Sequence, residues 1–377
     1  MLKLKVIGAG AAGNKAAIDL IKNGFSPTDV TLINSTSKDI PEEYKTNSII
    51  FGATADTLGG CGKERDVGRN LFLKDLKSGA INLDTIVDPD TRAVIIVSST
   101  EGGSGSAITP ILAKYINEVC GVPVILALFF GFNSDVRGMQ NSIEICQELT
   151  DSYGVIGISN SKFLADANNN KIKAEQLANA EFCSIVRILS GIDIVPGSQN
   201  IDDTDLYKLV VTPGYMCVGK TSLKGVKNIE TFNKVFHTVI DESKLIDSTK
   251  KTAKRIGIIL DIPESMDDSV DYNASVLSQR YGTPYELYTH VQNTSNTGEA
   301  SWVIAGMDLP IDEIKEIFEN YKKASSNVSK EKDSFFATVA GFSGNDQDSM
   351  FNMLSGRNTV SKNAKNAFFS GYNMGEK

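Results

Sequence analysis

The sequence predicts an α/β protein with a parallel-sheet first domain, a long central helix and a smaller α/β second domain. Short apolar strands alternate with helical segments up to about residue 170, which is typical of a mostly parallel sheet covered on both faces. Two glycine-rich segments each follow a strand and precede a helix. Because ligands of such sheets bind at the carboxyl ends of the strands, both glycine segments are predicted to line one site.

The first domain is expected to span residues 1–171. Its first helix is predicted to run from the first glycine segment through Lys22, and a second helix to cover about 109–118. The predicted strands of this domain are 4–7, 30–33, 93–97, 124–129 and 155–158.

A long core helix is predicted at 172–192, because apolar side chains recur there at helical spacing and Gly191 supplies a C-terminal cap. The second domain is expected at 193–322. Its predicted elements are strands near 255–260, 285–291 and 302–304 and an amphipathic helix at 311–321. Ser, Asn, Lys and Gly accumulate after Lys322, so 323–377 is expected to form a helical or flexible tail.

The composition excludes several classes of protein. The 377-residue chain carries a formal net charge of -8, which disfavours direct binding to nucleic acid. Its five cysteines show no C-x-x-C spacing and it has two histidines, so disulfides, a histidine metal site and a Ser-His-Asp triad are disfavoured. No apolar run reaches membrane-spanning length and no signal peptide is visible. We therefore expect a cytoplasmic protein without a membrane partner.

The segment Gly-Gly-Ser-Gly-Ser at 102–106 is predicted to bind phosphate. It follows an apolar strand and begins a helix, so several backbone N–H groups can converge on an anion beside the positive end of the helix dipole. No lysine follows these glycines as the P-loop pattern requires, so the segment belongs to another class of phosphate loop.

The first glycine segment, Gly8-x-Gly10-x-x-Gly13, also matches the dinucleotide-binding pattern of nicotinamide and flavin oxidoreductases. That pattern requires an acidic residue at the end of the second strand to hold the ribose. The strand here ends in Asn34-Ser35, and an oxidoreductase has no use for a second phosphate loop. The oxidoreductase therefore remains the less favoured alternative.

Five loops, in order, resemble those of the tubulin/FtsZ superfamily of polymerising GTPases, over most of residues 1–320. Residues 8–14 resemble the first phosphate loop, and residues 60–62 resemble the loop that senses the γ-phosphate. Residues 102–106 resemble the signature G-G-G-T-G-[ST]-G, with serine for both threonines and Glu101 where the family often has glycine. The resemblance implies that GTP or GDP contacts Gly10, Ala11, Ala12, Asn14, Gly60, Cys61, Gly62, Gly102, Gly103, Ser104, Gly105 and Ser106.

Further contacts to the ribose and the base are implied by the same resemblance. Residues 130–137 resemble the family's F-x-F-E-G-x-x-R, with Asn133 in place of the glutamate and Arg137 retained. Asn160 occupies the position of the asparagine in P-N-x-x-L. Asn179 matches the core-helix asparagine whose amide reads the guanine edge with a donor and an acceptor. Mg²⁺ is expected with the GTP, and no residue is assigned to hold it.

Residues 199–206 resemble the family's catalytic loop, N-x-D-x-x-D-[LV], at Asn200, Asp202 and Asp205. In the family this loop completes the nucleotide pocket of the next subunit, and its acidic residues polarise the attacking water. The resemblance therefore implies head-to-tail filaments in which catalysis waits for polymerisation. Asp202, Asp203 and Asp205 also suit the N-terminus of a helix, as a cap without a catalytic role.

Three roles within the superfamily compete. A TubZ-like filament that segregates plasmid or phage DNA in a bacterial cytosol is favoured by Glu101, Asn133 and the long C-terminal extension. An FtsZ-like cell-division ring is the alternative, but the chain ends without the short acidic-apolar peptide of that branch. A binding homologue that has lost hydrolysis is disfavoured by the presence of Asp202 and Asp205.

The tail carries a separate and weaker hypothesis. Arg357, Lys362 and Lys365 form a basic strip without an intervening acidic residue. On an acidic protein, such a strip suits contact with a neighbouring subunit or with a DNA-bound adaptor protein. A solvated tail without a partner is the alternative.

Overall fold

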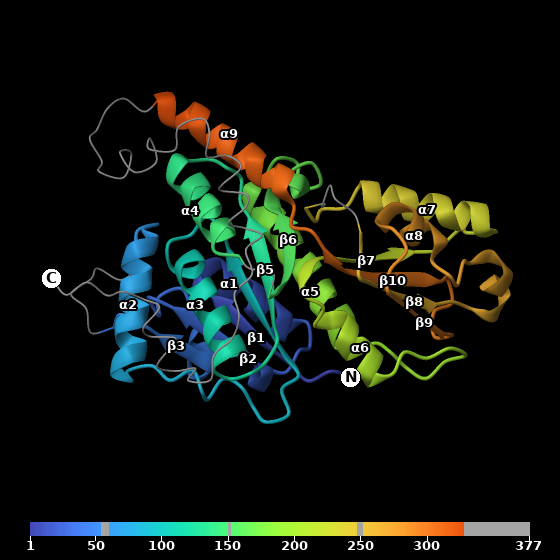
Figure 1. The fold of residues 1–377 in the computed structure, drawn as a ribbon, viewed down its shortest axis with the longest axis horizontal. Helices are drawn as coiled ribbons and strands as arrows, with labels where there is room; N and C mark the ends of the chain where they lie inside the picture. The colour runs from blue at the N-terminus through green and yellow to red at the C-terminus, as the bar shows by residue number, and fades with distance from the viewer. Residues whose placement is uncertain (54–59, 150–151, 247–251, 328–377) are drawn as a thin grey trace.

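The computed structural model describes residues 1–53, 60–149, 152–246 and 252–327 of the chain. Ten strands form one continuous sheet in the order β3-β2-β1-β4-β5-β6-β7-β10-β8-β9. Figure 1 shows the N-terminal half of this sheet, in blue to green, beside the C-terminal half, in yellow to orange. Helix α5 lies between the two halves.

The N-terminal half is a parallel sheet. All neighbouring pairs from β3 to β7 run in parallel, and β1, β5 and β6 are buried along their whole length. Their runs of valine, isoleucine, leucine and phenylalanine follow from this burial, because both faces are covered. The strands are β1 (Leu4–Ala9), β2 (Val30–Asn34), β3 (Ser48–Ile50), β4 (Ala93–Ser99), β5 (Val124–Phe130) and β6 (Gly154–Ser159).

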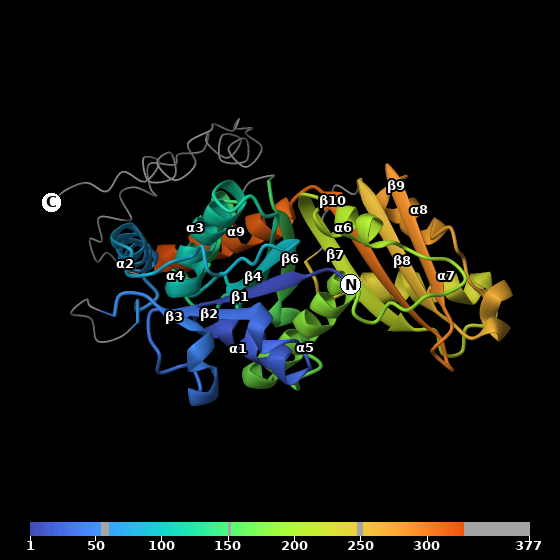
Figure 2. The ribbon, with the colours of Figure 1, turned by 90° about the horizontal axis from the view of Figure 1, so that it is seen from below.

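Helices cover both faces of this parallel sheet. Figure 2 shows α1 and α5 on one face and α2, α3 and α4 on the other. The predicted glycine cap of the core helix is confirmed, because Gly191 follows α5 with a φ of 64°. The helices are α1 (Gly10–Lys22), α2 (Arg65–Ser78), α3 (Ser104–Glu118), α4 (Val136–Gln147) and α5 (Lys171–Ser190).

The C-terminal half continues the sheet with mixed pairing. The junction is narrow, since β6 pairs with β7 at two positions, and β10 then runs antiparallel to both β7 and β8. Helices α5 and α6 contact one face, and Figure 1 shows α7 and α8 on the other. The strands are β7 (Gly214–Ser222), β8 (Arg255–Asp261), β9 (Glu286–Gln292) and β10 (Glu299–Met307). The helices are α6 (Asp203–Val210), α7 (Ile229–Asp241) and α8 (Ser275–Tyr281), and short 3₁₀ segments occupy Pro27–Asp29, Glu42–Asn47, Asn160–Phe163 and Glu264–Ser269.

Helix α9 (Ile311–Asn327) returns to the N-terminal half and packs against α4 (Figure 1). The sequence predicted this amphipathic helix within the second domain, at 193–322, so the structure differs in its location. Ile314, Ile317 and Tyr321 are its buried residues. Their spacing predicts an apolar stripe along the helix, but it does not identify the surface that the stripe covers.

The predicted α/β class, the parallel first sheet and the long central helix are confirmed. The basic strip at Arg357, Lys362 and Lys365, with the rest of the tail after Asn327, lies outside the described residues. Within the described ranges, no helix has the length and apolar content needed to cross a lipid bilayer.

Candidate functional site

The two glycine segments pack on each other at the carboxyl ends of β1 and β4. These strands are parallel neighbours, with Ala9 opposite Ser98. Gly10 has a φ of 74°, and a Cβ built on it would lie 2.7 Å from the backbone nitrogen of Gly105. A Cβ on Gly105 would lie 2.4 Å from the carbonyl oxygen of Ala9. Backbone therefore packs directly on backbone here, and a side chain at either glycine would separate the loops.

These two loops and the segment that begins at Gly60 enclose a cavity of about 380 Å³, a volume typical of small-molecule sites. Residues predicted to contact nucleotide line it from all three segments. They are Gly10, Ala11, Ala12, Gly60, Cys61, Gly62, Gly102, Gly103, Ser104 and Gly105. The cavity lies where the strand order predicts a ligand site, at the carboxyl edge of the parallel strands.

The two helices that begin at this cavity suit an anion. Among the described residues, Ala9 and Gly103 are the N-caps of α1 and α3, and neither provides a side-chain hydrogen bond to the helix. The N–H groups of both first turns are therefore available to a ligand, beside the positive ends of two helix dipoles. Phosphate groups fit this arrangement.

The two serines of the second glycine loop have different surroundings. Ser104 lines the cavity, and its hydroxyl lies 2.8 Å from the hydroxyl of Ser35, which follows β2. Ser106, also predicted to contact nucleotide, is fully buried behind the cavity wall, and its hydroxyl donates to the carbonyl oxygen of Gly102. In this structure Ser106 therefore stabilises the loop from behind.

Two predicted contact residues are buried with polar atoms that have no partner among the described residues. These atoms are both amide atoms of Asn14, on α1, and Oδ1 of Asn160, directly after β6. An unsatisfied buried polar group costs about 1–3 kcal/mol, so such groups indicate a water or a ligand. Neither asparagine belongs to the cavity wall, so their contact with nucleotide stays a prediction.

The other predicted nucleotide contacts do not line the cavity. Asn133 has a φ of 51° and donates its backbone N–H to Glu101 at 2.8 Å. Arg137 makes a long hydrogen bond within α4, at 3.5 Å. Asn179, on α5, donates its amide to Asp19 on α1 at 2.8 Å. This bond uses one of the two N–H donors of the amide and leaves its oxygen without a partner among the described residues, so the role of Asn179 in reading guanine stays a prediction.

Glu101 joins the second glycine loop to the segment after β5. Its carboxylate accepts the N–H of Asn133 and lies against Gly131, where a Cβ would come within 2.1 Å of the carboxyl carbon. Burial raises the pKa of Glu101, and the nearby charge of Asp135 raises it further. The hydrogen bond from Asn133 and the charge of Lys63 oppose this shift. Glu101, which stands where the family often has glycine, thus has a structural role.

We expect Glu101→Gln to remove part of the pH dependence of folding. A raised pKa means that the folded protein binds this proton more tightly than the unfolded chain does. Wild-type stability therefore falls as pH rises from about 4.5 through the raised value. The variant should gain stability relative to wild type between pH 4.5 and 7. Urea unfolding at both pH values measures this, and parallel profiles of the two proteins would contradict it.

Two buried side chains that the sequence did not single out tie the cavity loops together. Asn141, on α4, donates its amide to the carbonyl oxygens of Lys63 and Glu101, both at 3.0 Å. Arg65, at the start of α2, contacts the carbonyl oxygen of Ser106 at 3.0 Å and pairs with two glutamates of α4. Helix α4 therefore holds the loops before α2 and α3 in a fixed relation.

Some residues on the cavity wall were also missed. Ser35, Thr36 and Asp39 line it from the loop after β2, and Lys63 lines it from the loop before α2. The loop after β2 has no glycine pattern. The position of this loop could have indicated that it lines the site, because it follows a strand of the parallel sheet at the carboxyl edge.

The predicted catalytic loop lies at the opposite edge of the sheet. Asp203 pairs with the amino terminus of Met1 at 2.9 Å, and Met1 precedes β1, whereas the cavity follows the carboxyl end of β1. The six residues of this strand span roughly 20 Å. The loop and the cavity of one subunit therefore face different ends of the molecule.

The predicted catalytic residues occupy an ordered turn. Asp202 is the N-cap of α6, where Oδ1 accepts the N–H of Asp205 at 2.8 Å, so the predicted helix cap is present. Asp202 remains exposed, so capping and a catalytic role are compatible. Asn200 makes two hydrogen bonds to the backbone three residues earlier. His290, fully buried in β9, accepts the N–H of Ile201 at 3.3 Å and anchors the loop.

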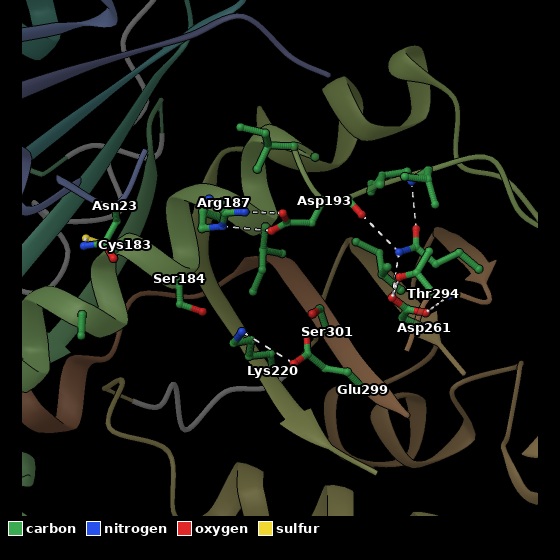
Figure 3. A pocket seen from close by; sticks show the side chains of 18 residues that line it. Asn23, Cys183, Ser184, Arg187, Asp193, Lys220, Asp261, Thr294, Glu299 and Ser301 are labelled. Carbon is green, nitrogen blue, oxygen red and sulfur yellow. Dashed lines mark hydrogen bonds and ion pairs between the residues drawn. The ribbon is translucent and has the colours of Figure 1, made fainter. Parts of the chain in front are cut away.

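A larger cavity of about 790 Å³ lies between α5 and the C-terminal strands (Figure 3). Figure 3 shows two ion pairs among its side chains, Arg187 with Asp193 and Lys220 with Glu299, and Asp261 bonded to Thr294. Asp193 belongs to the segment that leads to the acidic loop. These polar groups hold that segment in place, whereas the uncapped helix ends lie at the smaller cavity, which we therefore take as the candidate site.

Known proteins resemble this chain in sequence and in structure. Residues 3–168 match the model of the Tubulin/FtsZ family, GTPase domain. The cell division protein FtsZ of Aquifex aeolicus (strain VF5) is 25% identical over 275 residues, which is 71% of this chain and 73% of that protein. In two further division proteins the matched part is 57% and 54% of their length.

Solved structures extend the likeness to the C-terminal half. CetZ2 from Haloferax volcanii, in a GTPγS-bound protofilament, matches 86% of this chain and 100% of its own, with a TM-score of 0.70 at 18% identity. A GTPγS-form protofilament of TubZ from Bacillus thuringiensis serovar israelensis matches 86% of this chain and 93% of its own, with a TM-score of 0.71 at 17% identity. Residues 3–168 of this chain therefore belong to the tubulin/FtsZ family of GTPase domains, and the protein has the tubulin/FtsZ fold.

Proposed function

We propose that this protein is a GTPase that polymerises head to tail and hydrolyses GTP between neighbouring subunits. The observation that carries the proposal is the separation of two half-sites. The phosphate cavity lies at one edge of the sheet, and the loop with Asp202 and Asp205 lies at the other. Stacking would bring the loop of one subunit to the cavity of the next, and such contacts give open filaments because they do not close. The GTPγS-containing protofilaments of the two relatives support this arrangement.

Each half-site supplies a different part of the reaction. The N–H groups of residues 10–12 and 102–105 would bind the phosphates of GTP and, after hydrolysis, of GDP. Asn200, Asp202 and Asp205 of the neighbouring subunit would orient a water molecule in line with the γ-phosphate, and a carboxylate of the two aspartates would take up its proton. The mechanism needs no nucleophilic side chain, because water is the nucleophile.

Mg²⁺ is expected with GTP. In the described ranges, no group of three or more His, Cys, Asp or Glu could hold a metal ion by itself. Phosphate oxygens and water would therefore supply most of its ligands, with Asp39 nearby on the cavity wall. When bound, the ion would neutralise charge on the phosphates.

For the cellular role, we favour segregation of plasmid or phage DNA in a bacterial cytosol, through an adaptor protein bound by the tail. The net charge of -8 supports an adaptor rather than direct contact with DNA. The second candidate is a division ring, favoured by the curated sequence relatives, which are division proteins. Deleting the gene separates the two roles: loss of a plasmid or prophage from dividing cells supports segregation, and filamentous undivided cells support division.

We expect GTP turnover per subunit to rise with protein concentration, because each site needs two subunits. Phosphate release across a dilution series measures this directly. Electron microscopy should show filaments with GTP and with a slowly hydrolysed analogue, and disassembly with GTP alone. A rate per subunit that does not depend on concentration would exclude the shared site.

A further inference from the structure

Lys63 brings a positive charge to the wall of the phosphate cavity. Among the described residues that line the cavity, it is the one with a cationic side chain. Its Nζ lies 2.6 Å from Oδ2 of Asp135, at the start of α4, and these side chains are 49% and 44% exposed. An ion pair this exposed contributes little to stability, so Lys63 can exchange partners at low cost.

The backbone of Lys63 is fixed, although its side chain can move. Its φ is 64°, its carbonyl oxygen accepts the amide of Asn141, and a Cβ on Gly103 would lie 2.7 Å from its Cα. Lys63 is thus packed against the glycine loop that is proposed to bind phosphate. A lysine side chain extends roughly 6 Å from Cα, which is enough to reach an anion on that loop.

Asp135 would still cap α4 after its ion pair with Lys63 is broken. Its other oxygen, Oδ1, accepts the N–H of Gly138 at 2.8 Å and caps α4. Departure of Lys63 would leave an exposed, capping carboxylate, which is a stable arrangement. The bound γ-phosphate would offer Lys63 more negative charge than one carboxylate does, and a charge-assisted hydrogen bond.

We propose that Lys63 exchanges Asp135 for the γ-phosphate when GTP binds, and so makes the site prefer GTP over GDP. The inference rests on the proposed function, because it requires nucleotide in this cavity. GDP lacks the γ-phosphate, so in the GDP state Lys63 stays paired with Asp135. The exchange breaks the ion pair between the loop before α2 and the start of α4. Whether these two elements are joined by the ion pair therefore depends on which nucleotide is bound.

Two variants and two controls test this. Affinities for GTP and GDP are measured by titration calorimetry with Mg²⁺, at protein concentrations below assembly. Lys63→Met keeps the length of the side chain and should weaken GTP about tenfold or more, with GDP within about twofold of wild type. Asp135→Asn keeps the helix cap but frees the lysine, and should tighten GTP relative to GDP. Lys74→Met, on the exposed face of α2, should change neither affinity, and Lys63→Arg should keep the preference for GTP.

The ratio of the two affinities decides the outcome. An unchanged GTP-to-GDP ratio in Lys63→Met, or an equal loss of both affinities, would overturn the inference, because a structural role alone affects both nucleotides alike. If wild-type protein binds neither nucleotide, the proposed function itself fails. If the inference alone fails, wild type and Lys63→Met both bind GTP and GDP, and the ratio of the two affinities is the same in both proteins.

Discussion

Replacing Asp202 with asparagine should slow GTP turnover about a hundredfold or more and leave filaments that persist in GTP. Asparagine is as good an N-cap as aspartate, so α6 keeps its first turn. The variant loses the carboxylate that would take up the proton of the attacking water. GTP binding should be unchanged, because the loop and the cavity lie at opposite edges of the sheet.

Asp203→Asn provides the matched control. Asp203 is the next residue and is exposed, and its ion pair with the amino terminus is also exposed, so this pair contributes little. Phosphate release and light scattering should show wild-type turnover and filament lifetime for this variant. Equal slowing by both substitutions would assign the effect to loss of charge on the loop, and wild-type turnover in Asp202→Asn would exclude this residue as the activating group.

A mixing experiment tests whether the two half-sites come from different subunits. Gly102→Asp places a carboxylate at the cavity wall, where a Cβ meets no atom within 4 Å, so it should block phosphate binding without disturbing the fold. Asp202→Asn and Gly102→Asp should each be inactive alone. An equimolar mixture should recover up to about a quarter of wild-type turnover, since one junction in four then pairs an intact cavity with an intact loop. No recovery would contradict the shared site.

The N-terminal sheet was predictable because its determinants are local. The strands β4 and β5 contain continuous apolar runs that end at small polar residues or glycine, and β1 is apolar apart from Lys5. Strand β7 was missed because Gly219 interrupts its apolar run. A contact with a neighbouring strand requires glycine at this position, since a Cβ there would lie 2.6 Å from the ring of Trp302 on β10. The sequence of β7 alone does not contain this contact.

Helices α2 and α4 were missed for a related reason. Their buried faces include charged and amide side chains, so their apolar content is lower than that of α1, α3 and α5. Arg65 is buried because glutamates of α4 pair with it, and Asp75 is buried because its carboxylate accepts the N–H of Gly52 at 2.6 Å. These partners lie far away along the chain, and only the fold brings them together.

The candidate site likewise contains residues that the sequence could locate and residues whose contacts it could not predict. The phosphate loops could be located because glycine at positions such as Gly10 and Gly105 reflects a close backbone contact, which the sequence records directly. The residues predicted to bind the base depend on the orientation of side chains. Asn179 donates one N–H to Asp19, a contact that the sequence does not reveal. Asn14, predicted as part of the first phosphate loop, is buried without a partner among the described residues. Sequence patterns identify these residues but not the hydrogen bonds that they make.

Gly105→Ala should damage the site, because it adds a methyl group where the two glycine loops are in direct backbone contact. Its Cβ would lie 2.4 Å from the carbonyl oxygen of Ala9, a backbone atom that cannot rotate away. The start of α3 must therefore move away from β1. The N–H groups of the two loops then no longer point toward the same site. We expect a loss of about 1–3 kcal/mol in the free energy of unfolding. Turnover should fall about a hundredfold, because a shift of about 1 Å misplaces the phosphates relative to the acidic loop.

Gly102→Ala is the control for this change, because it adds the same methyl group to the same loop in open space. Urea unfolding without nucleotide should give the wild-type midpoint for Gly102→Ala and a lower midpoint for Gly105→Ala. Equal midpoints would show that the loops do not interlock through their backbones. A lower midpoint with normal turnover would show instead that the contact stabilises the fold but does not position the phosphates. The two measurements together therefore separate the structural role of the glycine contact from its role in binding.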